Sequence, residues 1–409
     1  MSISKAQALI NEAKKNHLTS LNLSSLGLVS IPEEVFELPW LKKLILSNTD
    51  YHFETMEWAA PREGGGVANR INKIPVALRK LRHLEEFYFD NDSEKKSHLQ
   101  GTEVLSTLKN LKVISLDYHK VDNIEPLKYL INLSTLSLNN TGIRNLEPLR
   151  NLFSLKHLLL GHNGIVNVEP LSNLSGLIIL SLQDNDINEI QSLAKLESLK
   201  SLYLEHNHVK DIKPLAELIM LEALNLNSNQ IQNISEINNL NKLRSLDLDS
   251  NKIQSLRPIL QFLEENYKTT FSVKRNPLTD PPIEIADRGV SAIINYFKEL
   301  EQGVREDIDI AQSLVPVRYQ TKFDVVKAVN TRFSATRADD PMTAFTRSVD
   351  FVCSKGQITV YDDKDAEMFA AILTLSNDGK CRLVVDGKEL TQWQFRRMAL
   401  EKLFFSSSE

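Results

Sequence analysis

The chain is poor in cysteine and has no long apolar run. Cys353 and Cys381 are its only cysteines, which excludes a fold held together by several disulfides. Both lie in segments that alternate like strands, where we expect buried free thiols. No run approaches the roughly 18 apolar residues that a membrane-spanning helix needs, so we expect no membrane span.

The charge balance gives no sign of a polyanionic partner. The net charge is −5 at pH 7, and neither end carries a long run of like charges. We therefore expect no binding to nucleic acid or to an anionic membrane. Met1 to Lys15 mixes apolar and basic residues at helical spacing, which predicts an amphipathic cap and not a signal peptide. A cytoplasmic protein is expected.

What the chain does have is an internal repeat. A fixed period of this length indicates a solenoid, in which each unit buries its apolar face against its neighbours. The period is 22 residues, and the same phase of seven consecutive units is occupied by His119, Thr141, Asn163, Asn185, Asn207, Asn229 and Asn251.

Each unit contains a short alternating segment. Successive side chains of a strand point to opposite faces, so Leu158 and Leu160 should point inward. Their neighbours Leu159 and Gly161 should face outward. Asn163 follows where the chain turns away, and its amide can satisfy backbone groups that the turn leaves unpaired. Each unit is therefore predicted to be a strand followed by an asparagine-stabilised turn.

The second half of each unit returns along a path rich in proline. Proline fixes φ and donates no hydrogen bond, so we expect tight turns or 3₁₀ segments on the convex side instead of long helices. The prolines that recur in phase are Pro126, Pro148, Pro170, Pro214 and Pro258.

These positions together identify the repeat. Residues 105 to 260 resemble the SDS22-like and internalin-type class of leucine-rich repeats, whose units carry the same Leu, Asn, Ile and Pro-Leu positions. The resemblance implies an α/β solenoid with a parallel β-sheet on its concave side. It says little about function, because one scaffold serves many partners. Secreted members usually carry cysteine-rich caps, which this sequence lacks.

The array begins irregularly and is interrupted early. A first unit runs from Leu18 to Pro32 and a second begins at Leu41, after which residues 50–70 break the period. Insertions into a solenoid emerge as loops on one face. This insertion carries Trp58 among other aromatic residues, so either it folds back on the array or it awaits a partner.

The repeat signal fades after residue 269. Residues 270–303 are interpreted as a closing segment whose helix covers the open end of the array. The stretch from Asn276 to Phe297 and the N-terminal start are similar to the corresponding segments of bacterial Roco proteins. In that family a GTPase domain with a Gly-rich phosphate loop follows, and this sequence contains no such motif. Only the scaffold is carried over.

The last part of the chain lacks the 22-residue repeat and has a different pattern of apolar residues. Residues 304–314 are interpreted as a linker, and the stretch from Phe323 to Phe333 suggests a helix. Two hairpins are predicted, around Lys355-Gly356 and around Asn377-Asp378-Gly379, and a final helix follows. The predicted organisation is a helical cap at 1–17, repeats at 18–269, a closing segment at 270–303, the linker, and a small α+β domain of unassigned family at 315–409.

Candidate contact residues come from outward positions of the repeats. Residues one period apart are neighbours on a parallel sheet, roughly 4.8 Å apart, so side chains from several repeats combine into one patch. A rigid patch of polar and aromatic side chains suits protein binding. The predicted partner-binding residues are Tyr118, His157, His162, Asp184, Tyr203, Glu205, His206, Asp247 and Asp249, with Trp58 from the insertion.

Two other interpretations of this patch compete with protein binding. The column of His162, Asp184 and His206 resembles a metal site, but its histidines would lie about 9 to 10 Å apart, too far for shared coordination at about 2 Å per bond. We therefore expect no metal or cofactor. The second alternative is a polar patch that only solvates the sheet.

Two functions remain open at this point. The leading hypothesis is a non-enzymatic recognition module whose concave face binds a partner protein, in regulation, in defence or as a host-directed effector, while the C-terminal domain supplies an output or a second interaction. The rival is a metal-dependent effector, such as a nuclease, built on Asp362, Asp363 and Asp365. Turns and caps also favour those residues, and no histidine follows His208 to serve as a general base.

Overall fold

The computed structural model divides the chain into two compact units, Met1–Ile294 and Asn295–Glu409, and each is described by itself. In the first unit the described residues are 2–47, 51–52, 57–58, 67–91 and 97–294, and the description continues to residue 300. In the second unit it further covers the strands between residues 331 and 390.

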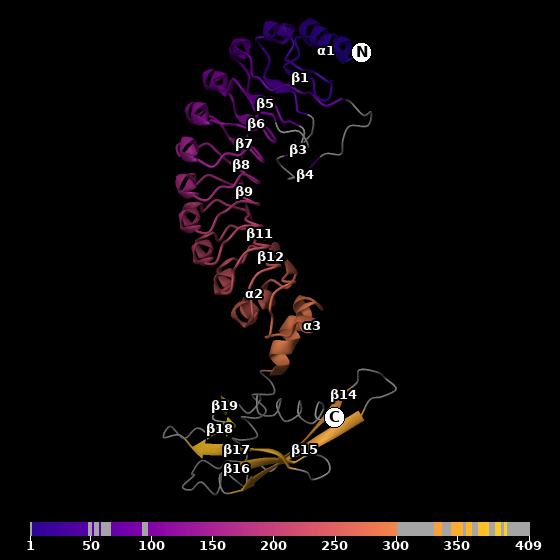
Figure 1. The fold of residues 1–409 in the computed structure, drawn as a ribbon, viewed down its shortest axis with the longest axis vertical. Helices are drawn as coiled ribbons and strands as arrows, with labels where there is room; N and C mark the ends of the chain where they lie inside the picture. The colour runs from indigo at the N-terminus through magenta and orange to yellow at the C-terminus, as the bar shows by residue number, and fades with distance from the viewer. Residues whose placement is uncertain are drawn as a thin grey trace. The chain divides into compact units, whose positions relative to one another are not determined.

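A parallel sheet lines the inner side of the curved first unit (Figure 1). Neighbouring strands pair in register one period apart, so that Leu158 lies between Leu136 and Leu180. Every strand is three residues long. In sheet order they are β1 (Ser20–Asn22), β2 (Lys43–Ile45), β5 (Glu86–Tyr88), β6 (Val113–Ser115), β7 (Thr135–Ser137), β8 (His157–Leu159), β9 (Ile179–Ser181), β10 (Ser201–Tyr203), β11 (Ala223–Asn225), β12 (Ser245–Asp247) and β13 (Thr270–Ser272).

The return path of each repeat forms a short 3₁₀ segment on the outer side of the curve (Figure 1). Proline stands in the first turn of several of them, as Pro148 does in η5, which confirms the prediction of 3₁₀ segments. Among the described residues these segments are η1 (Glu33–Glu37), η2 (Val76–Lys80), η3 (Thr102–Thr107), η4 (Glu125–Tyr129), η5 (Glu147–Leu149), η6 (Glu169–Leu171), η7 (Gln191–Lys195), η8 (Lys213–Glu217), η9 (Ser235–Asn239) and η10 (Arg257–Ile259).

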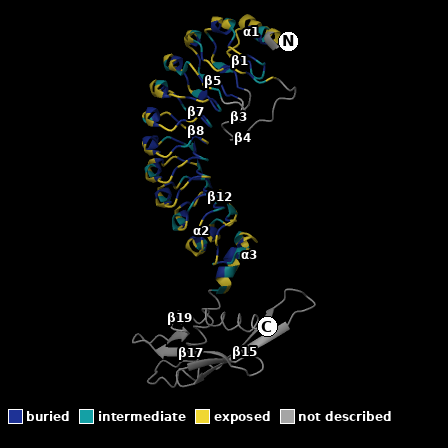
Figure 2. Cartoon of the chain, viewed as in Figure 1, coloured by how far each residue is buried: buried dark blue, intermediate teal, exposed yellow. Residues whose placement is uncertain are grey.

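The core lies between the strands and the 3₁₀ segments. Figure 2 shows buried residues filling this space, with exposed residues on the outer turns. Leu158 and Leu160 are fully buried, as predicted, and Ile165 from the return path is fully buried beside them. Burying one such side chain stabilises the fold by about 1.5–3 kcal/mol, so similar layers along the 11-stranded sheet hold the array together without disulfides.

The predicted asparagine position forms a continuous ladder of backbone contacts. Asn185 donates from Nδ2 to the carbonyls of Leu160, at 3.0 Å, and of Leu182, at 2.9 Å. Its Oδ1 accepts the N–H of Ile165 at 2.9 Å. One side chain thereby satisfies buried backbone groups of two adjacent repeats, which would otherwise cost about 1–3 kcal/mol each. The same role belongs to Asn163, Asn207, Asn229, Asn251 and Asn276.

Two repeats replace this asparagine in different ways. Thr141 donates its hydroxyl to the carbonyl of Leu138 at 2.8 Å, so it keeps part of the ladder. His119 is 1% exposed, and among the described residues neither ring nitrogen has a hydrogen-bond partner of good geometry. Burial lowers the pKa of its imidazole to about 4, which the nearby Phe89 backbone only partly offsets. His119 therefore packs as a neutral ring, 4.8 Å from the ring of Phe89.

The early insertion contains a small hairpin. Strands β3 (Tyr51–His52) and β4 (Glu57–Trp58) pair antiparallel, with Tyr51 opposite Trp58. The side chains of these residues lie outside the described part, so neither sequence interpretation of Trp58 is tested.

The insertion ends earlier than the sequence suggests. Asn69, inside the predicted range 50–70, occupies the ladder position of the second repeat: its Oδ1 accepts the N–H groups of Leu26 and Leu28 at 3.1 and 2.9 Å. Its Nδ2 donates to the carbonyls of Leu23 and Leu46, both at 2.9 Å. Residues 67–70 therefore belong to the repeat array, and the first ladder asparagine lies two units before the regular period begins.

Helices lie at both ends of the array. At the start, α1 (Ser2–Lys15) contacts β1 and buries Ala6, Ile10 and Ala13, which is the amphipathic pattern expected. At the far end, β13 pairs with β12, so the sheet extends past the predicted boundary at residue 269. Along the chain, α2 (Leu260–Glu265) precedes β13. α3 (Ile283–Ala286) and the helical residues 290–300 follow it. None of the described helices is long and apolar enough to cross a membrane.

The second unit contains an antiparallel sheet in which each strand pairs with the next. Both predicted hairpins are confirmed: Cys353 pairs with Ile358, and Ile372 with Val384. Phe333 lies in a strand, so the helix predicted to reach it is wrong at that end. Its start at Phe323, the final helix and Asp362 to Asp365 lie outside the described residues. The strands are β14 (Thr331–Arg337), β15 (Phe345–Ser354), β16 (Gln357–Tyr361), β17 (Glu367–Leu375), β18 (Cys381–Val385) and β19 (Lys388–Leu390).

Candidate functional site

A column of residues in the left-handed backbone region runs along the rim of the sheet. These residues follow each three-residue strand, so they form a turn and are not strand positions as the sequence suggested. Each donates its N–H to a carbonyl of the next repeat, as His162 does to Gln183 at 2.9 Å. Short polar side chains tolerate positive φ best. The column comprises Tyr118, Asn140, His162, Asp184, His206, Ser228 and Ser250, with φ from 52° to 63°.

The middle of this rim carries a histidine beside an acid. His162 Nε2 lies 3.5 Å from Asp184 Oδ2, and the two side chains are 52% and 38% exposed. An ion pair this open to water contributes little to folding. His206, one repeat beyond Asp184, is exposed as well. The rim therefore presents three polar side chains that the fold itself hardly needs.

Glu205 lies beside this rim and is the most perturbed acid on the open part of the face. Burial, together with the charges of Asp184 and Asp247, raises the pKa of its carboxyl to about 7. Its Oε2 is buried and has no hydrogen-bond partner among the described residues. A buried acceptor without a donor is costly, so Glu205 is under-satisfied in the free protein.

The reason for this lies in the next repeat. The N–H of Asn227 is donated to Oδ1 of Asn225, in the same repeat, at 3.0 Å. One repeat further, the N–H of Asp249 is donated to Oδ1 of Asp247 at 2.9 Å. Because Asn225 already accepts the N–H of Asn227, that N–H is not donated to the carboxylate of Glu205 in the preceding repeat.

In the N-terminal half of the concave face, buried acids do receive hydrogen bonds from the following repeat. Asp117, four repeats earlier at the position equivalent to Glu205, is 2% exposed. Its Oδ1 accepts the Ser137 hydroxyl and the Asn139 N–H, both at 2.7 Å, and its Oδ2 accepts Asn139 Nδ2 at 3.0 Å. Asp90 repeats the pattern by accepting the Ser115 hydroxyl and the Asp117 N–H. These carboxylates join neighbouring repeats.

Sequence reasoning missed Asp90 and Asp117 as structural residues. Burial raises the pKa of both carboxyls, that of Asp117 to about 7, and the nearby Asp90 charge adds to the effect on Asp117. One sequence feature could have revealed this role. In each case the following repeat places a serine in the neighbouring strand that donates to the acid, Ser115 to Asp90 and Ser137 to Asp117.

Asp249 is a correction to the predicted contact residues. It is 8% exposed, and its Oδ1 accepts the Ser272 hydroxyl at 2.6 Å and the Lys274 N–H at 2.7 Å. It holds the last strand of the sheet in place, as Asp117 does earlier. Leu159, which was expected to face outward, is also buried, at 1% exposure. Gly161, likewise buried, lies under the side chain of Gln183.

The remaining predicted residues are distributed unevenly. Tyr203 is half-buried, and burial raises the pKa of its phenol, with the Glu205 charge adding to the shift. His157 is half-buried with Nδ1 at 3.2 Å from the Thr135 hydroxyl. Tyr118 lies four repeats from His206, next to Asp117, and is half-buried.

The structure thus gathers one cluster from the predicted set. We call it the open patch: His162, Asp184, Tyr203, Glu205, His206 and Asp247. Within the described residues no three His, Cys, Asp or Glu side chains are placed to hold a metal ion together.

Comparisons with known proteins agree with the fold. Residues 175–217 match the family model described as leucine rich repeats, two copies. The chain is similar to the solved structure of an internalin (inlF) from Listeria monocytogenes, at 23% identity over 68% of this chain and 82% of that chain, with a TM-score of 0.53. It is also similar to a TDR receptor, at 21% identity over 67% of this chain and 46% of that chain, with a TM-score of 0.54.

A further internalin, C2 from Listeria monocytogenes, is 31% identical over 42% of this chain and 74% of that chain, with a TM-score of 0.40. No curated protein is similar enough to the chain to count as a match. The likeness to the internalin inlF and to the TDR receptor establishes the fold class, an α/β solenoid of leucine-rich repeats with a parallel concave sheet.

Proposed function

We propose that the open patch binds a partner protein. The observation that carries this proposal is Glu205, whose buried Oε2 has no hydrogen-bond partner among the described residues. A partner that draws the Glu205 carboxylate to the surface and donates to it would satisfy that acceptor on binding, and the gain is larger than at an already solvated carboxylate. Tyr203 supplies an aromatic surface next to it, a residue type that dominates binding hot spots.

The charge of the patch indicates the chemistry of the partner. The strands and turns from Thr135 to Ser250 present Asp184, Glu205 and Asp247 on this face, and no Lys or Arg occupies the outward positions between them. We infer a partner segment that carries basic or amide donors, since complementary charge favours both encounter and correct register.

The repeat scaffold supports such a role physically. Each strand is bonded to its neighbours in register, and the Asn ladder holds the turns, so the side chains of the patch project from ordered backbone. A pre-formed surface loses little conformational entropy when it binds. We further propose a non-enzymatic, cytoplasmic protein of the SDS22-like or internalin type, with the C-terminal unit as an output or second interaction module.

The experiment is capture of partners from native extract, with identification by mass spectrometry. Tyr203→Ala combined with His206→Ala should lose the partner that the wild-type chain captures. Phe153→Ala is the matched control, because Phe153 is 59% exposed and lies outside the open patch. A partner lost from the control as well as from the double variant, or from neither, contradicts the proposal.

A further inference from the structure

A recess opens near the C-terminal end of the array, away from the open patch. Asn251 and Asn276 of the ladder are 25 positions apart, whereas Asn229 and Asn251 are 22 apart. The three additional residues accommodate α2, a helical turn wider than the 3₁₀ segments of other repeats. Between this repeat and the one before it lies a recess of about 670 Å³, within the range of about 300–1,000 Å³ typical of ligand sites.

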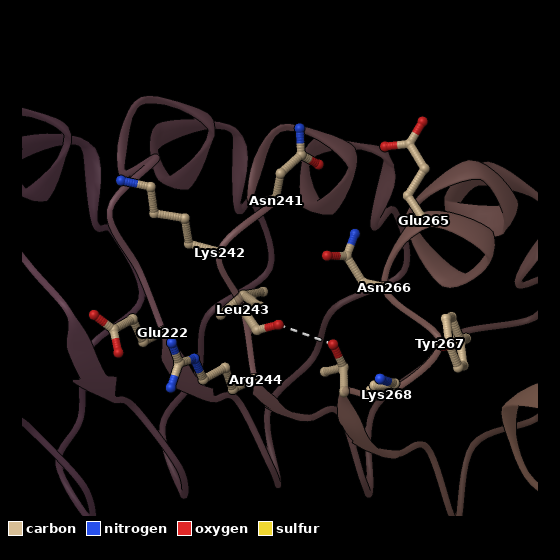
Figure 3. A pocket seen from close by; sticks show the side chains of 10 residues that line it. Glu222, Asn241, Lys242, Leu243, Arg244, Glu265, Asn266, Tyr267 and Lys268 are labelled. Atoms are coloured by element: carbon tan, nitrogen blue, oxygen red, sulfur yellow. Dashed lines mark hydrogen bonds between the residues drawn. The ribbon is translucent and has the colours of Figure 1, made fainter.

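Figure 3 shows how the side chains are arranged around the recess. Thr269 lines the recess, and its hydroxyl donates to the Leu243 carbonyl at 2.8 Å. Arg244 and Lys268 lie on either side of that hydrogen bond, with Asn266 above it. Tyr267, which is 60% exposed, forms one wall, with Lys268 Nζ 5.6 Å from its ring centroid.

The charges in the recess are unevenly satisfied. Within the part of the chain that the structure describes, Lys242, Arg244 and Lys268 have no carboxylate within 4.0 Å. Lys242 Nζ lies 2.9 Å from the sulfur of Met220. Both acids of the lining have partners. Glu222 pairs with Lys200 at 3.0 Å, and this hydrogen bond, together with the nearby charges of Arg244 and Lys242, lowers the pKa of its carboxyl. Glu265 accepts the amide of Gln261 at 2.9 Å.

We propose that this recess binds a phosphate ester, with the phosphate between Arg244 and Lys268 and the organic group against Tyr267. A guanidinium matches the oxygens of a phosphate with parallel donors, and an ammonium adds a point charge. The amide of Asn241 lines the recess as a neutral donor, whereas that of Asn266 donates to the Phe262 carbonyl at 3.0 Å. This site is separate from the open patch, so its occupancy does not depend on the function proposed above.

The test measures binding of two probes, phenyl phosphate and inorganic phosphate, to the full-length chain by ligand-observed NMR titration. Phenyl phosphate should bind saturably. Arg244→Gln combined with Lys268→Gln should weaken binding at least about tenfold. Tyr267→Ala should weaken binding of phenyl phosphate and leave that of inorganic phosphate unchanged. All three side chains are exposed, and an unchanged melting temperature checks that each variant is folded.

Lys252→Gln is the matched control, because Lys252 lines a different depression with Lys210, Gln230 and Gln232. Loss of binding in this control equal to that in the double variant would show unspecific charge attraction and overturn the proposal. So would the absence of saturable binding at millimolar probe. A phosphotyrosine peptide distinguishes the sources: tighter binding than phenyl phosphate indicates a phosphorylated protein, and equal binding a small ester.

Discussion

Asp117 and Glu205 occupy the same repeat position four units apart, yet the fold uses them differently. Asp117 accepts three hydrogen bonds from the following repeat, whereas Glu205 Oε2 accepts none among the described residues. Burial raises the pKa of both carboxyls to about 7. The comparison teaches that burial alone does not mark a structural acid. What the next repeat donates decides whether the acid stabilises the array or remains available to a partner.

The largest expected effect is on stability at the structural acid. Asp117→Ala leaves the Ser137 hydroxyl and the Asn139 N–H without their acceptor inside the sheet. We expect the free energy of unfolding to fall by about 2–3 kcal/mol, measured by urea denaturation. Glu205→Ala, the matched change at the equivalent position, removes a buried acceptor that has no donor among the described residues, so it should leave the free energy of unfolding unchanged or raise it by up to about 1 kcal/mol. Equal losses in the two variants would remove the distinction.

The pH dependence of stability sharpens the same point. The pKa of Asp117 is raised above its unfolded value of 3.8 to about 7, so the folded state holds this proton more tightly than the unfolded state. Its contribution is fully present below pH 3.8 and is lost as the pH rises through about 7. Asp90 shifts in the same direction. Urea titrations from pH 5 to 8 should show a decline that is shallower in Asp117→Asn.

Changes in the open patch should affect partner binding and not stability. Tyr203→Ala with His206→Ala removes an aromatic surface and a polar side chain from the open patch, and we expect partner affinity to fall at least about tenfold. The melting temperature should stay nearly unchanged, since His206 is exposed and Tyr203 only half-buried. Calorimetric titration of the purified partner measures the affinity. A loss that appears only together with a lower melting temperature would be a folding effect.

The smallest effect is expected at the exposed ion pair. Asp184→Asn removes the negative charge beside His162, whose side chain is 52% exposed. Because such pairs are screened by water, stability should change by less than about 0.5 kcal/mol. A larger change in thermal unfolding would mean that the rim of the sheet contributes more to the fold than its exposure indicates.

Much of the array was predictable from sequence because its physics is local and periodic. The inward leucines, the asparagine turns and the 3₁₀ return path each follow from one residue type at one spacing. Asn69 was missed because the insertion breaks the spacing by which the ladder is counted. The burial of Asp249 and Leu159 was missed because it depends on the neighbouring repeats that cover them.

The candidate site was predictable only in outline. Alternation placed His162, Asp184 and His206 in one column, but their left-handed turn has no such signal. The contrast between Asp117 and Glu205 depends on whether the next backbone N–H is already taken, as Asn225 takes that of Asn227. Whether this N–H is donated within its own repeat or to the preceding one depends on the three-dimensional geometry, which residue spacing does not reveal.

The most direct test of the account is the affinity of Glu205→Gln for the captured partner, measured from pH 6 to 8. Because the pKa of Glu205 is raised to about 7 in the free chain and a basic donor favours its ionised form, wild-type affinity should rise with pH. The variant, which cannot ionise, should bind at least about tenfold more weakly at pH 8, with a much flatter pH profile. Equal affinity and equal pH dependence for the two proteins would contradict the claim that Glu205 is held available for a partner.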